Sequence, residues 1–125
     1  MITLSKAQIK RLHSKQIEAT GGSDGIRDET LLDSALAAPF HTFDGMELYP
    51  SAAAKIARLA YGLVSNHPFV DGNKRIGTYV MLVLLELNRM EAEFTDDDII
   101  KIGLGLAEGK MSDAELLKII LERLK

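Results

Sequence analysis

The residues of this chain that are best suited to catalysis lie in one short segment, His67 to Arg75, which reads His-Pro-Phe-Val-Asp-Gly-Asn-Lys-Arg. His67 ordinarily titrates near neutral pH, which makes it a candidate base for a hydroxyl proton. Asp71 is a hard oxygen ligand suited to Mg²⁺, which binds one or two carboxylates together with phosphate oxygens. Lys74 and Arg75 are candidate phosphate ligands, because an arginine fork grips two oxygens at once.

The same segment lies where two helical patterns meet. Pro68 and Gly72 interrupt the helix between His67 and Asn73, and an apolar helical pattern follows. Free backbone N–H groups and the positive end of the helix dipole gather at such an amino end, and they bind anions. The junction therefore combines a base, a metal ligand and a phosphate cradle, which are the parts required for phosphoryl or nucleotidyl transfer.

Each of these residues also has a purely structural interpretation. His67 ends a helix, where a positive charge is favourable at the negative pole. Asp71, Gly72 and Asn73 are typical of a turn followed by a helix cap. The two cations could be solvated surface charges, and Phe69 is expected to be a buried anchor of the loop. Residue types and spacing alone leave both interpretations open.

The elements around the junction are predicted to be helices. The stretch Ile76 to Met90 is apolar on almost all sides, which predicts a core helix wrapped by the others. The remaining helices are expected from Ser5 (with Gln8 at capping-box spacing) to Gly21, from Asp28 to Pro39, from Ser51 to His67, from Thr95 onward, and from Ser112 (with Glu115) onward. Between Pro39 and Pro50 the pair Asp44-Gly45 predicts a β-hairpin. The fold class is therefore all-α with one hairpin.

Composition limits the remaining possibilities. A chain of 125 residues with 46% hydrophobic content predicts a single domain, 1–125, with a proper core. The net charge of −3 disfavours nucleic acid and anionic membranes as direct partners. The absence of cysteine excludes disulfides and suits a reducing compartment, and neither a signal peptide nor a membrane-spanning run is expected. A soluble cytoplasmic protein is the simplest prediction.

The segment from His67 to Arg75 resembles the signature of the Fic/Doc superfamily, whose Fic branch has the pattern H-P-F-x-[DE]-G-N-G-R-x-x-R. It resembles more closely the death-on-curing (Doc) branch, H-x-F-x-D-[AG]-N-K-R. The segments GGSDGIRDETLLDSALAAP, GMELYPS and LLELNRM also look like those of Doc proteins, so the likeness extends over about residues 9 to 90. It implies a compact helical bundle with a central apolar helix and a hairpin flap, and a toxin of a type II toxin–antitoxin system.

The resemblance also implies roles for individual residues. His67 would be the general base, Asp71 the Mg²⁺ ligand, and Gly72, Asn73, Lys74 and Arg75 the residues that bind ATP. The hairpin residues Phe43, Asp44, Gly45 and Met46 fall where the family has its flap, an edge that aligns the backbone of the target beside the site. A plain surface hairpin is an equal alternative for this segment.

Two departures from the Fic pattern bear on the reaction and on how it is controlled. Fic nucleotidyl transferases carry a second arginine where this chain has Thr78, and threonine cannot clamp a terminal phosphate. Doc proteins also lack this arginine, and are thought to hold ATP reversed and to pass its γ-phosphate to a threonine of elongation factor Tu, which halts translation. The resemblance thus favours phosphate transfer, with AMP transfer as the alternative and a non-catalytic antitoxin-binding module as a second one.

The second departure concerns inhibition. The inhibitory helix motif [ST]-x-x-x-E-[GN] of many Fic enzymes is missing, because Leu104 occupies its first position in LGLAEG. A Doc-like toxin would then need an antitoxin in trans, supplied in the family by a disordered carboxyl-terminal segment that folds on the toxin.

Overall fold

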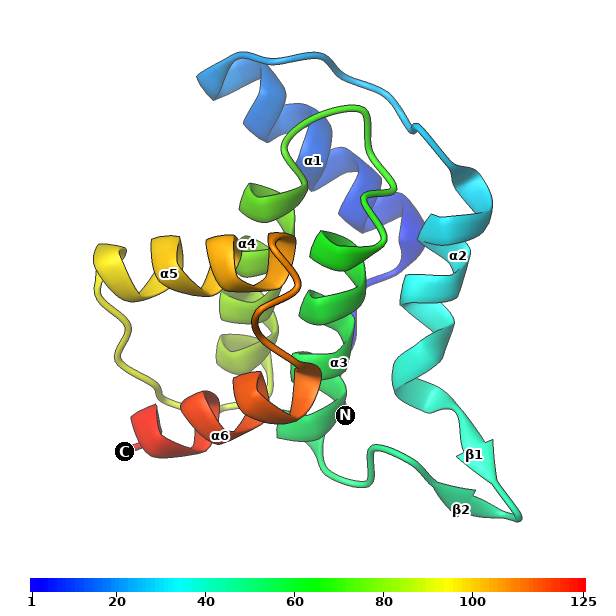
Figure 1. Ribbon diagram of the computed structural model, residues 1–125, viewed down its shortest axis with the longest axis vertical. Helices are drawn as coiled ribbons and strands as arrows, with labels where there is room; N and C mark the ends of the chain where they lie inside the picture. The colour runs from blue at the N-terminus through cyan, green and yellow to red at the C-terminus, as the bar shows by residue number, and fades with distance from the viewer.

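Six α-helices and one two-stranded hairpin make up the computed structural model, which describes all residues from 1 to 125 (Figure 1). In chain order the elements are α1 (Lys6–Thr20), α2 (Glu29–Ala37), the 3-10 turn η1 (Ala38–Phe40), β1 (Thr42–Phe43), β2 (Met46–Glu47), α3 (Ala52–Ser65), α4 (Asn73–Leu87), α5 (Asp96–Ala107) and α6 (Asp113–Arg123). The prediction of an all-α fold with one hairpin is confirmed. No helix is both long enough and apolar enough to cross a membrane.

Side-chain caps fix where five of the six helices begin. The capping residues are Ser5, Asp28, Ser51, Thr95 and Ser112, and each accepts a hydrogen bond from a backbone N–H in the first turn. In α1, α5 and α6 the third helical residue completes a reciprocal capping box. The remaining helix, α4, has no side-chain cap. Its exposed amino end is the start of the candidate site.

Two central helices, α3 and α4, share the core. In α3 ten residues are buried, and the helix packs against α2, η1, α4, α5 and α6. Small residues allow this close packing: a Cβ at Gly62 would lie 3.0 Å from the Cβ of Ala35. The central apolar helix expected over Ile76 to Met90 is present as α4, but α3 occupies the centre of the fold together with it. Tyr79 and Leu87 of α4 are exposed, so this helix is not surrounded on all sides.

The bounds of α4 also differ from the prediction. The helix begins at Asn73 rather than Ile76 and ends at Leu87 rather than Met90. It starts early because Gly72, at φ +78°, turns the chain directly into the helix without a capping side chain. Lys74 and Arg75 consequently belong to the first turn of α4, where side chains flank the free N–H groups.

The hairpin forms at the predicted turn. Thr42 pairs with Glu47 and Phe43 with Met46 in antiparallel register. Asp44 and Gly45 both have positive φ, at +52° and +79°, as a two-residue type I′ turn requires. The hairpin extends from the end of η1 and leads into the amino end of α3 (Figure 1).

Candidate active site

The loop between α3 and α4 is held in place by the segment that precedes α2. Backbone N–H groups of Arg27 and Asp28 donate to the carbonyl oxygen of Pro68, at 2.7 and 3.0 Å. The Arg27 guanidinium donates to the carbonyl oxygens of His67 and Asn66, at 2.7 and 3.1 Å. Phe69 is buried, as expected of an anchor. These contacts fix the path of the loop, so its polar side chains are presented on a rigid backbone.

A cavity of about 420 Å³ opens where this loop enters α4. All six motif residues predicted to bind or react line it, together with Val64 and Ala107: they are His67, Asp71, Gly72, Asn73, Lys74 and Arg75. Its volume lies within the range of small-molecule sites, roughly 300–1,000 Å³. The spacing in the sequence thus corresponds to one shared cavity in the structure.

The amino end of α4 presents groups to this cavity that are of the kind that binds anions. Gly72 is the residue before the helix and has no side chain to cap the first turn, and no acidic residue lies in that turn. The first N–H groups of a helix have no partner within the helix, so they remain available to a ligand. Lys74 and Arg75 add two full positive charges beside them.

The side chain of Asn73 is committed to the loop rather than to the cavity. The residue is 4% exposed, and its Oδ1 accepts the Phe69 N–H at 2.9 Å. Its Nδ2 lies 3.0 Å from the Phe69 carbonyl oxygen and 3.1 Å from Nδ1 of His67. Only the backbone N–H of Asn73 remains for a phosphate. His67 itself is exposed and has a left-handed backbone, with φ at +50°.

Asp71 lies at the mouth of the cavity, and the turn after α1 packs closely against it. Its Oδ1 accepts the Gly72 N–H at 2.8 Å, and its Oδ2 lies 3.4 Å from the Ser23 N–H. Gly22 has φ at +108°, which favours glycine, and a Cβ there would lie 2.5 Å from Oδ2 and would push the carboxylate aside. No group of three metal-ligating side chains is present. A single exposed carboxylate beside a phosphate site fits Mg²⁺, which takes its other ligands from phosphate and water.

Arg75 connects the cavity to the end of α1. Its guanidinium donates to the hydroxyl of Thr20 and to the carbonyl oxygen of Gly21, the latter at 3.3 Å. The carboxyl end of α1 therefore contacts the site through Arg75, although no residue of α1 lines the cavity. No local pattern in the sequence indicates this contact, because 55 residues separate Arg75 from Thr20.

His13 is a residue of the site that sequence reasoning missed. It is 1% exposed, and its ring stacks on Phe69 with the two ring centres 3.9 Å apart. Its Nε2 lies 2.6 Å from the carbonyl oxygen of Asp71, and its Nδ1 lies 3.4 Å from Oδ1 of Asp24. His13 thus packs the loop between α3 and α4 against α1. One signal was available: the histidine lies midway between Ile9 and Ile17 on the apolar stripe of the first helix.

Asp24 is held in turn by its own neighbours. The hydroxyl of Ser14 and the N–H of Gly25 donate to its carboxylate at 3.0 and 2.8 Å. These hydrogen bonds, led by that of Ser14, lower the pKa of Asp24 below its usual range. The support of the loop therefore extends from Asp71 through His13 to an ionised carboxylate at the surface.

Thr78 occupies the position of the second Fic arginine and is buried between α4 and α5. Its hydroxyl donates to the Lys74 carbonyl oxygen at 2.8 Å, within its own helix. A Cβ added at Gly103 of α5 would lie 3.7 Å from the Thr78 methyl group. Thr78 and Gly103 also line a cavity of about 240 Å³ between α4 and α5, so the short threonine side chain leaves open space between the two helices.

The segment nearest to the inhibitory motif also differs from the Fic pattern in its contacts. Leu104 is exposed, and Glu108 pairs with Lys110 at 3.1 Å. Glu108 therefore forms its ion pair outside the cavity.

The hairpin lies away from the cavity. It joins the amino end of α3, whereas the cavity lies at the carboxyl end of that helix (Figure 1). The 14 residues of α3 span about 20 Å. The predicted flap residues are Phe43, Asp44, Gly45 and Met46, and none of them lines the cavity. The structure therefore does not bring this part of the predicted site together with the rest, because α3 separates them.

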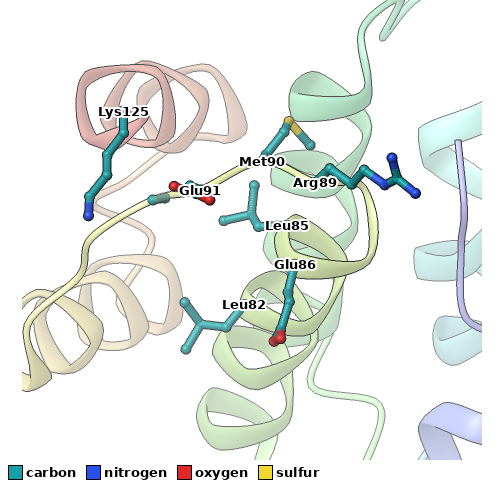
Figure 2. A pocket seen from close by; sticks show the side chains of 8 residues that line it. Leu82, Leu85, Glu86, Arg89, Met90, Glu91 and Lys125 are labelled. Carbon is teal, nitrogen blue, oxygen red and sulfur yellow. The ribbon is translucent and has the colours of Figure 1, made fainter.

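The largest cavity of the molecule, about 720 Å³, lies at the opposite end of α4 (Figure 2). Leu82 and Leu85 form part of its wall, and Glu86, Arg89, Glu91 and Lys125 bring charges of both signs. It contains no residue of the motif. This cavity is therefore distinct from the candidate active site.

Comparison with known proteins agrees with this site. A sequence profile described as "Fic/DOC family" matches residues 3–85. The chain is also 40% identical over 81 residues to a protein of Mycolicibacterium smegmatis (strain ATCC 700084 / mc(2)155) described as "Toxin Doc". That alignment covers 63% of this chain and 62% of the relative, so the chain matches less than two thirds of the relative's length. Since the profile matches more than half of the chain, including the whole loop from His67 to Arg75, this protein belongs to the Fic/DOC family.

Proposed function

We propose that this protein is a Doc-like toxin that transfers the γ-phosphate of ATP to a hydroxyl group of another protein. One observation carries the proposal: the uncapped amino end of α4, with Lys74 and Arg75 in its first turn, opens on a cavity that also contains His67 and Asp71. Phosphoryl transfer depends mainly on positioning and on charge stabilisation, and this cavity offers both.

The phosphates of ATP would lie against the backbone N–H groups at the start of α4. Gly72 lets the backbone approach them closely, and Asn73 contributes its N–H. Lys74 and Arg75 would neutralise the oxygens, and Asp71 would hold Mg²⁺. When bound, the metal ion stabilises negative charge that develops on the phosphate oxygens.

The reaction would be a direct displacement at the γ-phosphorus. The hydroxyl oxygen of the target forms a bond to phosphorus while the bond from phosphorus to the bridging oxygen breaks, and ADP leaves. The hydroxyl proton passes to His67, which is exposed at the edge of the cavity. His67 lines the same cavity as Arg75 and Asp71, as this role requires.

Thr78 favours phosphate transfer over AMP transfer. AMP transfer in the Fic branch depends on a second arginine, and the corresponding side chain here is buried against α5. Thr78 itself carries no charge that could hold the triphosphate in the Fic direction. AMP transfer to a protein hydroxyl remains the alternative reaction.

The biological role is proposed from the likeness to the "Toxin Doc" relative. We infer that residues 1–125 act as one domain in the cytoplasm, and that the target is a threonine of elongation factor Tu. Glu108 pairs outside the cavity, which supports control by an antitoxin in trans, through a disordered carboxyl-terminal segment that folds on the toxin. The net charge of −3 supports the absence of nucleic acid or membrane as direct partners.

The hairpin has a smaller part in this proposal than the sequence suggested. Phe43 and Met46 are 75% and 74% exposed, far from the reacting groups. They would contact a part of the target remote from the modified hydroxyl. A surface hairpin without a role in the reaction is the alternative.

Expression in bacteria combined with mass spectrometry tests the proposal. The wild-type protein should arrest growth and add one phosphate to purified elongation factor Tu in the presence of Mg²⁺ and ATP. His67→Ala should do neither, whereas His41→Ala, which changes an exposed histidine outside the cavity, should behave like wild type. A gain of AMP would establish the alternative reaction. Equal toxicity of His67→Ala would exclude base catalysis, and a wild type without toxicity would favour a non-catalytic antitoxin-binding module.

A further inference from the structure

We propose that Asn73 acts through His67 rather than on the nucleotide: its amide holds the resting imidazole in the tautomer that carries its proton on Nε2. This inference rests on the proposed function, because it concerns the residue that would take the hydroxyl proton. It makes Asn73 a positioning residue, although the sequence suggested a phosphate ligand at this place.

The orientation of the Asn73 amide is fixed by the backbone of Phe69. The Phe69 N–H needs an acceptor, and Oδ1 lies 2.9 Å from that nitrogen. The Phe69 carbonyl oxygen needs a donor, and Nδ2 lies 3.0 Å from it. If the amide were reversed, Nδ2 would face the Phe69 N–H, which is also a donor, and Oδ1 would face the Phe69 carbonyl oxygen, which is also an acceptor. Both residues are buried, so water cannot compensate for such a mismatch.

The fixed amide decides which nitrogen of His67 is protonated. Nδ2 of Asn73 lies 3.1 Å from Nδ1 of His67, and its second hydrogen points to that nitrogen, since the first is used by Phe69. An amide nitrogen only donates, so Nδ1 must accept with its lone pair. A neutral imidazole has one proton to place, and that proton is then on Nε2.

This tautomer conflicts with immediate base catalysis. Nδ1 of His67 is occupied by a buried donor, and Nε2, the other nitrogen, already carries the proton. His67 accepts a proton at Nε2 only after the hydrogen bond to Asn73 opens and Nδ1 becomes protonated instead. In serine proteases, replacing the aspartate that holds the catalytic histidine by asparagine imposes the wrong tautomer and lowers kcat about 10⁴-fold.

The same contacts leave no side-chain hydrogen of Asn73 for the nucleotide. Both Nδ2 hydrogens are used, by the Phe69 carbonyl oxygen and by His67. A phosphate would meet this residue only at its backbone N–H. The effects of Asn73 variants on catalysis and on ATP binding should therefore separate.

Nuclear magnetic resonance of protein with ¹⁵N-labelled imidazole rings measures the tautomer directly. The spectrum is recorded without nucleotide at a pH where the ring is neutral, and the His67 signals are assigned by comparison with His67→Ala. We expect the proton on Nε2 in the wild type. In Asn73→Asp a carboxylate faces Nδ1 and accepts, so the proton should move to Nδ1.

Asn66→Asp is the matched control. It makes the same change one residue before His67, but the Asn66 amide donates to the Leu31 carbonyl oxygen at 3.1 Å rather than to the imidazole. His67 should therefore keep its proton on Nε2 in this variant. Detection of Nδ1–H in the wild type, or equal shifts in both aspartate variants, would overturn the inference.

A kinetic test covers the case in which Asn73→Asp does not fold. Asn73→Ala frees Nδ1 of His67, but it also removes the side chain that holds the ring and the Phe69 backbone in place. We expect the loss of position to outweigh the freed nitrogen and to lower kcat, while KM for ATP stays within about twofold of wild type. A large rise in KM with unchanged kcat would show a phosphate ligand and overturn the inference. The proposed function and the tautomer inference can fail separately. If His67 carries its proton on Nε2 but the protein has no transferase activity, only the proposed function is rejected. If the enzyme is active but His67 carries its proton on Nδ1, only the inference is rejected.

Discussion

The amino ends of α4 and α5 differ in almost every feature that stabilises a helix start. Thr95 and Asp98 form a complete capping box at α5, and Asp96 and Asp97 add negative charge to its first turn. Arg123 donates to both oxygens of Asp98, at 2.8 and 3.0 Å. At α4 a glycine replaces the cap, and the charged residues of the first turn are cations.

The start of α4 is therefore less stable than the start of α5, and it lies where a ligand is expected. A missing cap costs about 1 kcal/mol, and each cation at the positive pole costs a few tenths of a kcal/mol more. The same features leave N–H groups and positive charge free for an anion. The one helix without a side-chain cap is therefore also the helix whose first residues line the candidate site.

The strongest way to break this comparison is to remove the charge at the α4 end. Arg75→Ala should lower the transfer rate about 100-fold or more, because one charged donor to the reacting phosphate is lost. The free energy of unfolding should change by less than about 0.5 kcal/mol, since Arg75 is partly exposed and does not belong to the buried core. Rates with Mg²⁺ and ATP and urea unfolding measure the two quantities.

Arg89→Ala is the matched control for Arg75→Ala, because Arg89 lies near the opposite end of α4 beside the larger cavity. It should leave the transfer rate unchanged. An unfolded Arg75→Ala variant would instead support a purely structural role for the arginine.

A second variant tests the packing between the two helices. Thr78→Arg should cost about 1–3 kcal/mol in the free energy of unfolding, because it places a larger, charged side chain at a buried position of α4. It should not add AMP to the target. Tyr79→Arg changes the next residue, which is exposed, and should unfold like wild type. Gain of AMP transfer in a stable Thr78→Arg protein would show that the threonine alone separates this chain from the Fic reaction.

The opposite prediction applies to the capped helix. Thr95→Ala should lower the free energy of unfolding by about 1 kcal/mol, because the N–H of Asp98 loses its acceptor. The transfer rate should stay at the wild-type value. Thr95→Ser keeps the hydroxyl and should keep the stability. Loss of activity in a folded Thr95→Ala variant would mean that the two helix ends are not separate in function.

The smallest effect concerns pH at the capped end. Hydrogen bonds from Thr95, first from its backbone N–H, and the charge of Arg123 lower the pKa of Asp98. The unfolded chain therefore binds this proton more readily, so the stabilisation is present above the usual carboxylate pKa and is lost as pH falls through the lowered value. Urea unfolding at several acid pH values should show a shallower pH dependence in Asp98→Asn than in wild type; an equal dependence would exclude Asp98 as its source.

Local features of the fold were predictable from the sequence. The capping boxes at Ser5 and Ser112 involve residues three positions apart, so the chain itself contains the whole signal. The turn at Asp44-Gly45 is equally local. The start of α4 was placed three residues late, because Gly72 begins the helix through its backbone conformation, which has no side-chain pattern.

Contacts between distant segments were not predictable in the same way. The motif residues meet at one cavity because they follow one another in a single loop. The position of the hairpin relative to that cavity depends on the length and direction of α3, and the roles of His13 and Thr20 depend on how α1 packs on the loop. The direction of the Asn73 amide follows from the backbone of Phe69, which composition and spacing do not specify.

The tie between Arg75 and the end of α1 has a consequence for any molecule that enters the cavity. Thr20 and Gly21 already hold the guanidinium that a polyphosphate would take. A bound polyphosphate would compete with the helix end for this guanidinium, and binding would break the contact between Arg75 and the end of α1. A spectroscopic probe attached near Thr20 would then report occupancy of a cavity that it does not touch.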